Sequence, residues 1–169
     1  MKIQILVAAL FLLSLQNAFA GVRYSVMGGV NYGYGTTSTT DTSTGLTATT
    51  KGGLGYGGGL LAEPMSFPLE VGVLYLSRHY QVTRTGFADS STNLHFVEIP
   101  VMFRLGHGSM TFGLGGFADI DIGDGSNYGL TAGPRFGGTH GGGFLDLRFS
   151  YGLKAGHTED IAAMLGYAF

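Results

Sequence analysis

The fold class of this chain is decided by its last nine residues, Ile161-Ala-Ala-Met-Leu-Gly-Tyr-Ala-Phe169. Every second residue of this segment is apolar and mostly large, and the residues between them are mostly small. Because side chains alternate between the two faces of a β-strand, the pattern predicts a strand with one apolar face and one nearly bare face. At the edge of a soluble protein such a strand invites aggregation, whereas in a lipid-embedded barrel its apolar face contacts acyl chains. The segment therefore favours the closing strand of a membrane barrel.

The other end of the chain has the organisation of a secretory signal peptide. Lys2 provides a positive start, residues 3–15 are almost wholly apolar, and Ala18 and Ala20 form a small-x-small cleavage pattern. The apolar run is shorter than the roughly 20 residues that a transmembrane helix needs. We expect cleavage after Ala20, so that residues 1–20 are a signal peptide and residues 21–169 form one barrel domain. The chain contains no Cys, so neither a disulfide nor a lipid-modified Cys is expected.

Composition favours an all-β fold and excludes a nucleic-acid-binding surface. The 169 residues include 31 Gly and no Trp, and the formal net charge is −2. The Gly content is far above the usual level of about 7%. No basic surface is available for nucleic acid. After the signal peptide there is neither a useful segment of helical period nor a long apolar run.

Eight segments alternate between apolar residues and polar or small ones, as half-buried strands do. They cover residues 22–33, 52–62, 69–82, 94–105, 110–122, 128–136, 145–153 and 161–169. Most are close to the 9–11 residues that a tilted strand needs to cross a bilayer. We therefore predict an eight-stranded antiparallel up-and-down transmembrane β-barrel.

The connections between these segments alternate in length in the first half of the chain. Residues 36–51 and 83–93 are long and polar, whereas residues 63–68 form a short turn. Outer-membrane barrels have short periplasmic turns and longer external loops. The two long connections are thus predicted to be outer loops, with both termini on the periplasmic side.

The polar faces of the segments separate a membrane barrel from a soluble barrel of the lipocalin type. Five acidic and five basic residues fall on these faces, including Asp119, Asp121 and Lys154, together with many Gly. A charge on the lipid-facing side costs roughly 2–4 kcal/mol at the bilayer midplane, and the apolar faces carry none. Turned inward, Gly relieves crowding and the charges can pair across a narrow lumen. The predicted network that closes the lumen consists of Glu70, Arg78, Glu98, Arg104, Arg135, Asp146 and Arg148.

Three parts of the chain resemble strands of one known family, the small outer-membrane β-barrel proteins often labelled the porin family. A family strand with the pattern LEIPLLLRY is similar to Asn93-Leu-His-Phe-Val-Glu-Ile-Pro-Val-Met-Phe-Arg104. The pair GLxAGxGxxF and LDxRYSYGL resembles Tyr128-Gly-Leu-Thr-Ala-Gly-Pro-Arg-Phe136 and Phe144-Leu-Asp-Leu-Arg-Phe-Ser-Tyr-Gly-Leu153. The LGYRF ending resembles Leu165-Gly-Tyr-Ala-Phe169, with Ala168 where a basic residue is common.

This resemblance covers most of the mature chain and speaks to fold and location much more than to activity. It implies an outer-membrane protein similar in architecture to OmpX and to the membrane domain of OmpA. In such barrels an aromatic carboxy terminus serves as a signal for the assembly machinery. The resemblance extends that role to Tyr167 and Phe169.

Two further sequence patterns resemble ligand-binding motifs, but we interpret neither as a binding site. The segment Gly53-Leu-Gly-Tyr-Gly-Gly58 matches the dinucleotide pattern G-x-G-x-x-G, but no helix follows to hold a pyrophosphate, so we interpret it as a Gly-rich strand. His79 and His95 flank the second outer loop on the apolar side. In a symmetric hairpin they would face each other, yet two imidazoles are a poor metal site and an interfacial position is favoured.

A calcium-like pattern and a catalytic pattern are also incomplete. The segment Asp119-Ile-Asp-Ile-Gly-Asp124-Gly lacks the Glu of a calcium loop, which leaves a rim cation as the minor alternative to solvated carboxylates. Ser77 lies near His79 and Ser109 near His107, but neither pair belongs to a recognisable Ser/His/acid signature. We expect no catalytic residue, no cofactor and no metal.

Taken together, these patterns predict a monomeric, non-enzymatic integral protein of the outer membrane of a Gram-negative bacterium. Its expected partners are outer-membrane lipid and lipopolysaccharide, the barrel assembly machinery and periplasmic chaperones, with no nucleic acid. Its expected role is structural, or in surface interaction or adhesion. A narrow passive channel for small solutes is the second hypothesis, and a lipid A-modifying enzyme is the third.

Overall fold

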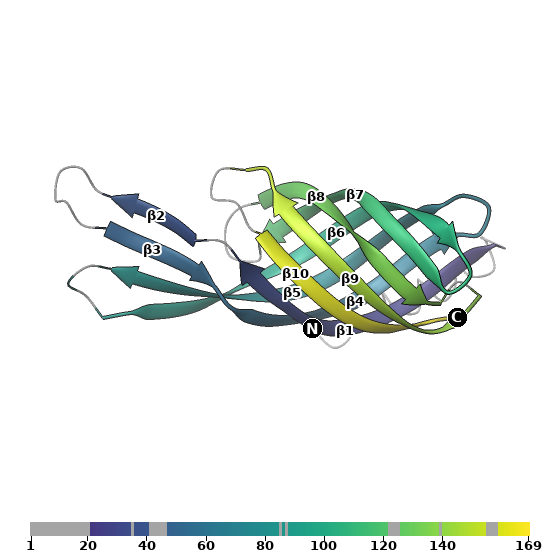
Figure 1. Ribbon diagram of the computed structural model, residues 1–169, viewed down its shortest axis with the longest axis horizontal. Helices are drawn as coiled ribbons and strands as arrows, with labels where there is room; N and C mark the ends of the chain where they lie inside the picture. The colour runs from purple at the N-terminus through teal and green to yellow at the C-terminus, as the bar shows by residue number, and fades with distance from the viewer. Residues whose placement is uncertain are drawn as a thin grey trace, which may run out of the picture.

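The structure is a computed structural model in which the described part of the chain is all-β (Figure 1). It describes residues 21–34, 36–40, 47–84, 86, 88–121, 126–138, 140–154 and 159–169. The predicted signal peptide, residues 1–20, lies outside the described residues.

The strands form one antiparallel sheet of ten labelled segments. They are β1 (Val22–Tyr34), β2 (Thr36–Thr40), β3 (Thr47–Gly52), β4 (Leu54–Pro64), β5 (Leu69–Arg84), β6 (Ser90–His107), β7 (Met110–Asp121), β8 (Ser126–Gly137), β9 (Gly142–Gly152) and β10 (Glu159–Ala168). Within this sheet, β1 and β4–β10 close into a barrel. The ring is complete because β1 pairs with both β4 and β10, and β5 pairs with both β4 and β6. The prediction of a closed eight-stranded antiparallel barrel is confirmed at this level.

A four-stranded extension projects beyond one rim of the barrel, on the left of Figure 1. It consists of β2, β3 and the adjoining ends of β5 and β6, in the order β2-β3-β5-β6. Pairing continues to Thr40↔Thr47, Ala48↔Arg84 and Val82↔Ser90. The prediction that residues 36–51 and 83–93 are loops is therefore wrong for most of their length. The β-branched Thr residues suit a strand, and their polarity does not exclude one.

Side chains alternate strictly between the lumen and the outside along the barrel strands. On β9, for example, Asp146, Arg148 and Ser150 are buried, whereas Phe149 and Tyr151 are exposed. Buried side chains, both apolar and charged, line the interior. Its buried apolar residues include Met27, Leu61, Leu74, Leu76, Phe144, Ala162, Met164 and Ala168. The large apolar residues on the opposite faces are exposed, so this barrel buries its charges and displays its apolar surface.

Candidate functional site: the charged lumen

The most distinctive site of the molecule is a set of nine charged side chains buried in the lumen. The set contains five carboxylates, Glu70, Glu98, Asp119, Asp146 and Asp160, and four guanidinium groups, Arg78, Arg104, Arg135 and Arg148. All seven residues of the predicted network belong to it. They form two clusters, which we call the basic cluster and the acidic cluster.

The basic cluster combines Glu70, Arg104, Arg135, Asp146 and Arg148, from β5, β6, β8 and β9. Glu70 accepts a hydrogen bond from Arg104 Nε at 2.9 Å. It also pairs with Arg135 Nη2 at 2.6 Å and with Arg148 Nη2 at 3.1 Å. Asp146 Oδ2 pairs with Arg104 Nη2 and Arg135 Nη2, both at 2.6 Å. Three guanidinium groups thus share two carboxylates, which gives this cluster a formal charge of +1 from its own members.

The acidic cluster has the opposite stoichiometry. Arg78 on β5 pairs through Nη1 with Asp119 Oδ2 at 2.6 Å, through Nη2 with Glu98 Oε2 at 3.2 Å, and through Nε with Asp160 Oδ2 at 2.7 Å. The three carboxylates come from β6, β7 and β10. One guanidinium group therefore faces three carboxylates, and the formal charge of the cluster is −2 when all are ionised.

Apolar side chains separate the two clusters along the barrel axis. On β5 the inward residues between Glu70 and Arg78 are Gly72, Leu74 and Leu76, and on β6 Pro100 and Met102 lie between Glu98 and Arg104. Leu74 and Met102 have no exposed surface. The basic cluster lies toward the short connection at residues 65–68, and the acidic cluster lies toward the extension.

Aromatic and glycine residues shape the space around the arginines. The Arg78 guanidinium lies 4.9 Å from the centre of the Phe96 ring, and that of Arg135 lies 4.4 Å from the centre of the Phe144 ring. At Gly113 on β7, an added Cβ would come within 3.2 Å of Arg104 Nη1. Gly at this inward position therefore leaves room for the Arg104 head group.

Two lumen residues were absent from the predicted network. Asp119 had been assigned to the polar face, and its burial against Arg78 follows from that face. Asp160 lies just before the predicted strand at residues 161–169, but it is the second residue of β10 and opposes Ser150 on β9. Its signal was the parity of the closing strand, because Ile161 faces outward and the residue before it must face inward.

One other charged residue of the polar faces, Lys154, does not join the clusters. Lys154 is exposed just beyond β9 and donates a hydrogen bond from Nζ to the Ser126 carbonyl at 2.7 Å. The side chain of Asp121 lies outside the described residues.

The two outward histidines do not face each other across the β5–β6 hairpin. His79 opposes Asn93, with 2.8 Å between His79 Nδ1 and Asn93 Oδ1. His95 opposes Ser77 and stacks on Tyr75, whose hydroxyl lies 2.7 Å from His95 Nδ1. Among the described residues, no group of three or more His, Cys, Asp or Glu is arranged to hold a metal ion.

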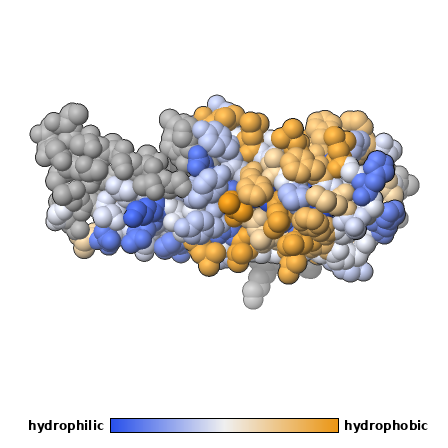
Figure 2. Space-filling view, viewed as in Figure 1, coloured by the Kyte–Doolittle hydropathy of each residue, from blue (hydrophilic) through white to orange (hydrophobic). Residues whose placement is uncertain are grey.

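Outward aromatic residues form two belts. The belt near the extension contains Tyr32, Tyr56, Tyr75, Tyr128 and Tyr151, and the belt near the other rim contains Phe67, Phe103, Phe112, Phe136, Tyr167 and Phe169. Aliphatic residues such as Val30, Leu60, Val73, Leu114 and Leu130 lie on the wall of the same barrel. Figure 2 shows this apolar surface in orange between hydrophilic surface at both ends.

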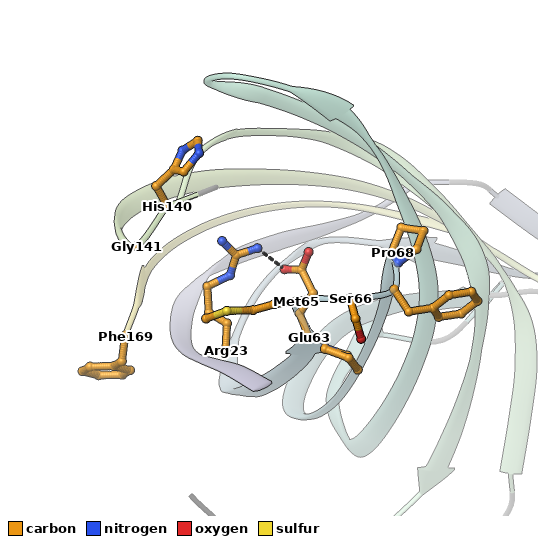
Figure 3. A pocket seen from close by; sticks show the side chains of 10 residues that line it. Arg23, Glu63, Met65, Ser66, Pro68, His140, Gly141 and Phe169 are labelled. Carbon is orange, nitrogen blue, oxygen red and sulfur yellow. Dashed lines mark hydrogen bonds and ion pairs between the residues drawn. The ribbon is translucent and has the colours of Figure 1, made fainter. Parts of the chain in front are cut away.

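The rim opposite the extension holds a pocket of about 660 Å³. Figure 3 shows Arg23 and Glu63 joined across it, with an Arg23 Nη2–Glu63 Oε2 distance of 2.8 Å. Phe169 lies at its edge, where its backbone N–H donates to the Tyr24 carbonyl at 2.9 Å. The Tyr167 and Phe169 rings make an edge contact with centres 5.4 Å apart.

Comparison of the chain with family models and with curated protein sequences finds no match. In the part of the chain that the structure describes, no helix is long and apolar enough to cross a membrane.

Proposed function

We propose that this protein is an integral β-barrel of a Gram-negative outer membrane whose closed body carries an interaction surface at its outer end. The observation that carries the proposal is the exposed apolar wall between two aromatic belts, around an interior that buries nine charged side chains. This arrangement is the inverse of that in a water-soluble protein. In water the wall would expose apolar surface while the charges in the interior lose their hydration. In lipid the cost of the exposed wall disappears, since the wall contacts acyl chains and aromatic rings favour the interface.

The filling of the lumen supports a closed barrel over a channel. Eight strands enclose a space just wide enough for side chains. In this barrel Glu70, Arg78, Leu74, Met102, Arg148 and Met164 are all almost fully buried. The two ionic clusters also tie strands together across the lumen, because Arg78 alone pairs with residues of β6, β7 and β10. The body of the protein is thus suited to anchoring rather than to transport.

The four-stranded extension supports the surface-interaction role. It places β2 at the end of the sheet order, paired with β3 along one edge. The N–H and C=O groups along the other edge of such a strand are suited to adding a strand from a partner. The extension lies beyond the Tyr belt. With both chain termini on the periplasmic side, this end of the barrel is on the external side of the membrane.

The depth dependence of one substitution tests the membrane proposal. Leu114→Arg introduces a charge on the wall, where Leu114 is 60% exposed, and Leu54→Arg makes the same change beyond the Tyr belt, where Leu54 is 67% exposed. We expect Leu114→Arg to destabilise the barrel refolded in lipid vesicles by roughly 2–4 kcal/mol, and Leu54→Arg by about 1 kcal/mol or less. The folded fraction is measured by heat modifiability on gels. Equal effects, or a purified protein that stays soluble without detergent, would contradict the proposal.

Replacing residues 37–50 by a short turn tests the role of the extension. The barrel pairings of β1, β4 and β10 do not involve these residues, so we expect unchanged heat modifiability. Cells that display the shortened protein should lose the adhesion to surfaces or to other cells that the full chain confers. Steady single-channel currents from the purified full-length protein in planar bilayers would instead support the narrow-channel hypothesis.

A further inference from the structure

The charges of the lumen do not balance. Five carboxylates face four guanidinium groups among the buried residues that the structure describes. The excess is local, because Glu98, Asp119 and Asp160 all converge on Arg78. An uncompensated charge in a closed interior is costly, and a buried group of this kind is neutralised instead.

Geometry identifies where the neutralising proton would sit. Glu98 and Asp119 are directly opposite each other on β6 and β7, and both carboxyl groups pair with the guanidinium group of Arg78. Two ionised carboxylates held side by side on one guanidinium group repel each other, which favours a proton on one of them. Independently, Asp119 has no exposed surface, and its Oδ1 has no hydrogen-bond partner among the described residues. Arg78 occupies the other oxygen, Oδ2.

We infer that the folded barrel holds one bound proton, shared between the carboxyl groups of Glu98 and Asp119. One proton brings the five carboxylates and four guanidinium groups to neutrality. It also supplies the O–H donor that the carboxyl pair lacks. The inference depends on the interior of the barrel and holds whether the wall is covered by lipid or by detergent.

The groups around this pair come from several strands. Arg78 and Tyr80 face it from β5, Asp160 from β10 and Arg148 from β9. Arg148 is shared, because it also pairs with Glu70 and Asp146 of the basic cluster. Among the described ion pairs, Arg78 is the one guanidinium group that pairs with the acidic cluster, and it faces three carboxylates.

A bound proton links stability to pH in a defined direction. The unfolded chain releases protons from carboxyl groups above about pH 4–5, whereas the folded barrel retains this one. Folding therefore takes up a proton at neutral pH. The contribution of this proton to stability is fully present below about pH 4–5, falls as pH rises, and levels off once the folded barrel also loses the proton.

Infrared spectroscopy of the folded protein tests the inference directly. At neutral pH the wild-type barrel should show the C=O stretch of a protonated carboxyl group shielded from water, equivalent to one group per chain. Glu98→Gln and Asp119→Asn should each abolish it. Glu63→Gln should leave it unchanged, because Glu63 lies at the rim in a balanced pair with Arg23. The wild-type spectrum decides the matter even if a variant fails to fold, and absence of the band from it would overturn the inference.

Thermal unfolding across pH is the second readout. The melting temperature of the wild type and of Glu63→Gln should fall from neutral to alkaline pH. That of Glu98→Gln should stay constant over the same interval, since Gln reproduces the neutral carboxyl group without a proton to lose. Parallel pH profiles for wild type and Glu98→Gln would also overturn the inference.

Discussion

The two clusters in the lumen use the same residue types in opposite proportions. The basic cluster has three arginines and two carboxylates, and the acidic cluster has one arginine and three carboxylates. In the basic cluster each carboxylate is contacted by all three arginines, so the loss of one cation leaves the others in place. In the acidic cluster all ion pairs pass through Arg78. The comparison shows that burial alone does not predict how much stability is lost when one of these residues is replaced. The loss depends on how many oppositely charged partners remain for the others.

Removing one arginine from each cluster should give the largest contrast. Arg78→Met leaves three buried carboxylates without a paired cation and should cost about 3–5 kcal/mol. Arg135→Met leaves two arginines facing two carboxylates, so its cost should be about 1–2 kcal/mol, mostly from the lost contact with Phe144. Urea unfolding of the refolded barrels measures both. Equal losses would show that the clusters are not distinguished by their stoichiometry.

Removing one carboxylate should destabilise the protein more in the basic cluster than in the acidic cluster, the opposite of removing one arginine. Glu70→Gln leaves three buried arginines with Asp146 as their acidic partner in the basic cluster, and we expect a loss of about 3 kcal/mol. Asp160→Asn relieves the excess of acid around Arg78, so its cost should be about 1 kcal/mol or less at neutral pH and smaller still at alkaline pH. The two variants are compared by urea unfolding at both pH values. A larger loss in Asp160→Asn would contradict the proposed charge excess.

The packed layer between the clusters is tested by two adjacent glycines. At Gly29 an added Cβ would lie 2.7 Å from Met164 Cα, too close for backbone atoms, whereas at Gly28 the nearest atom is the Gly57 carbonyl oxygen at 3.6 Å. Gly29→Ala should cost about 1–3 kcal/mol through overpacking. Gly28→Ala, on the outward face, should be within about 0.5 kcal/mol of wild type. Similar melting temperatures would indicate a wider barrel than the strand pairing implies.

The extension shows where sequence patterns fail. Residues 36–51 lack an apolar face, so alternation of hydrophobicity gave no sign of β2 and β3. β3 pairs with β5, through contacts such as Ala48↔Arg84, and β2 pairs with β3. These partners are distant in the chain, and segments that are polar at every position leave no period of two in the sequence.

The lumen shows the converse. The inward position of Glu70, Arg104 or Arg148 could be predicted because each lies on a strand whose other face is apolar. Which carboxylate meets which guanidinium group could not, since the pairs join β5 to β8 or β10 across the interior. The division into an acidic and a basic cluster therefore became visible only with the strands closed.

The sequence alone determined the all-β class, the eight barrel strands, and the face of eight of the nine buried charges, because these follow from a period of two along single strands. The tertiary structure decided the register that separates His79 from His95, the extension built from two predicted connections and the adjoining ends of β5 and β6, and the stoichiometry of the two clusters. Those features depend on which residues meet across the sheet and across the lumen. Contacts between strands are not recorded in the pattern of any one strand, and the excess carboxylate around Arg78 exists only where three strands converge on it.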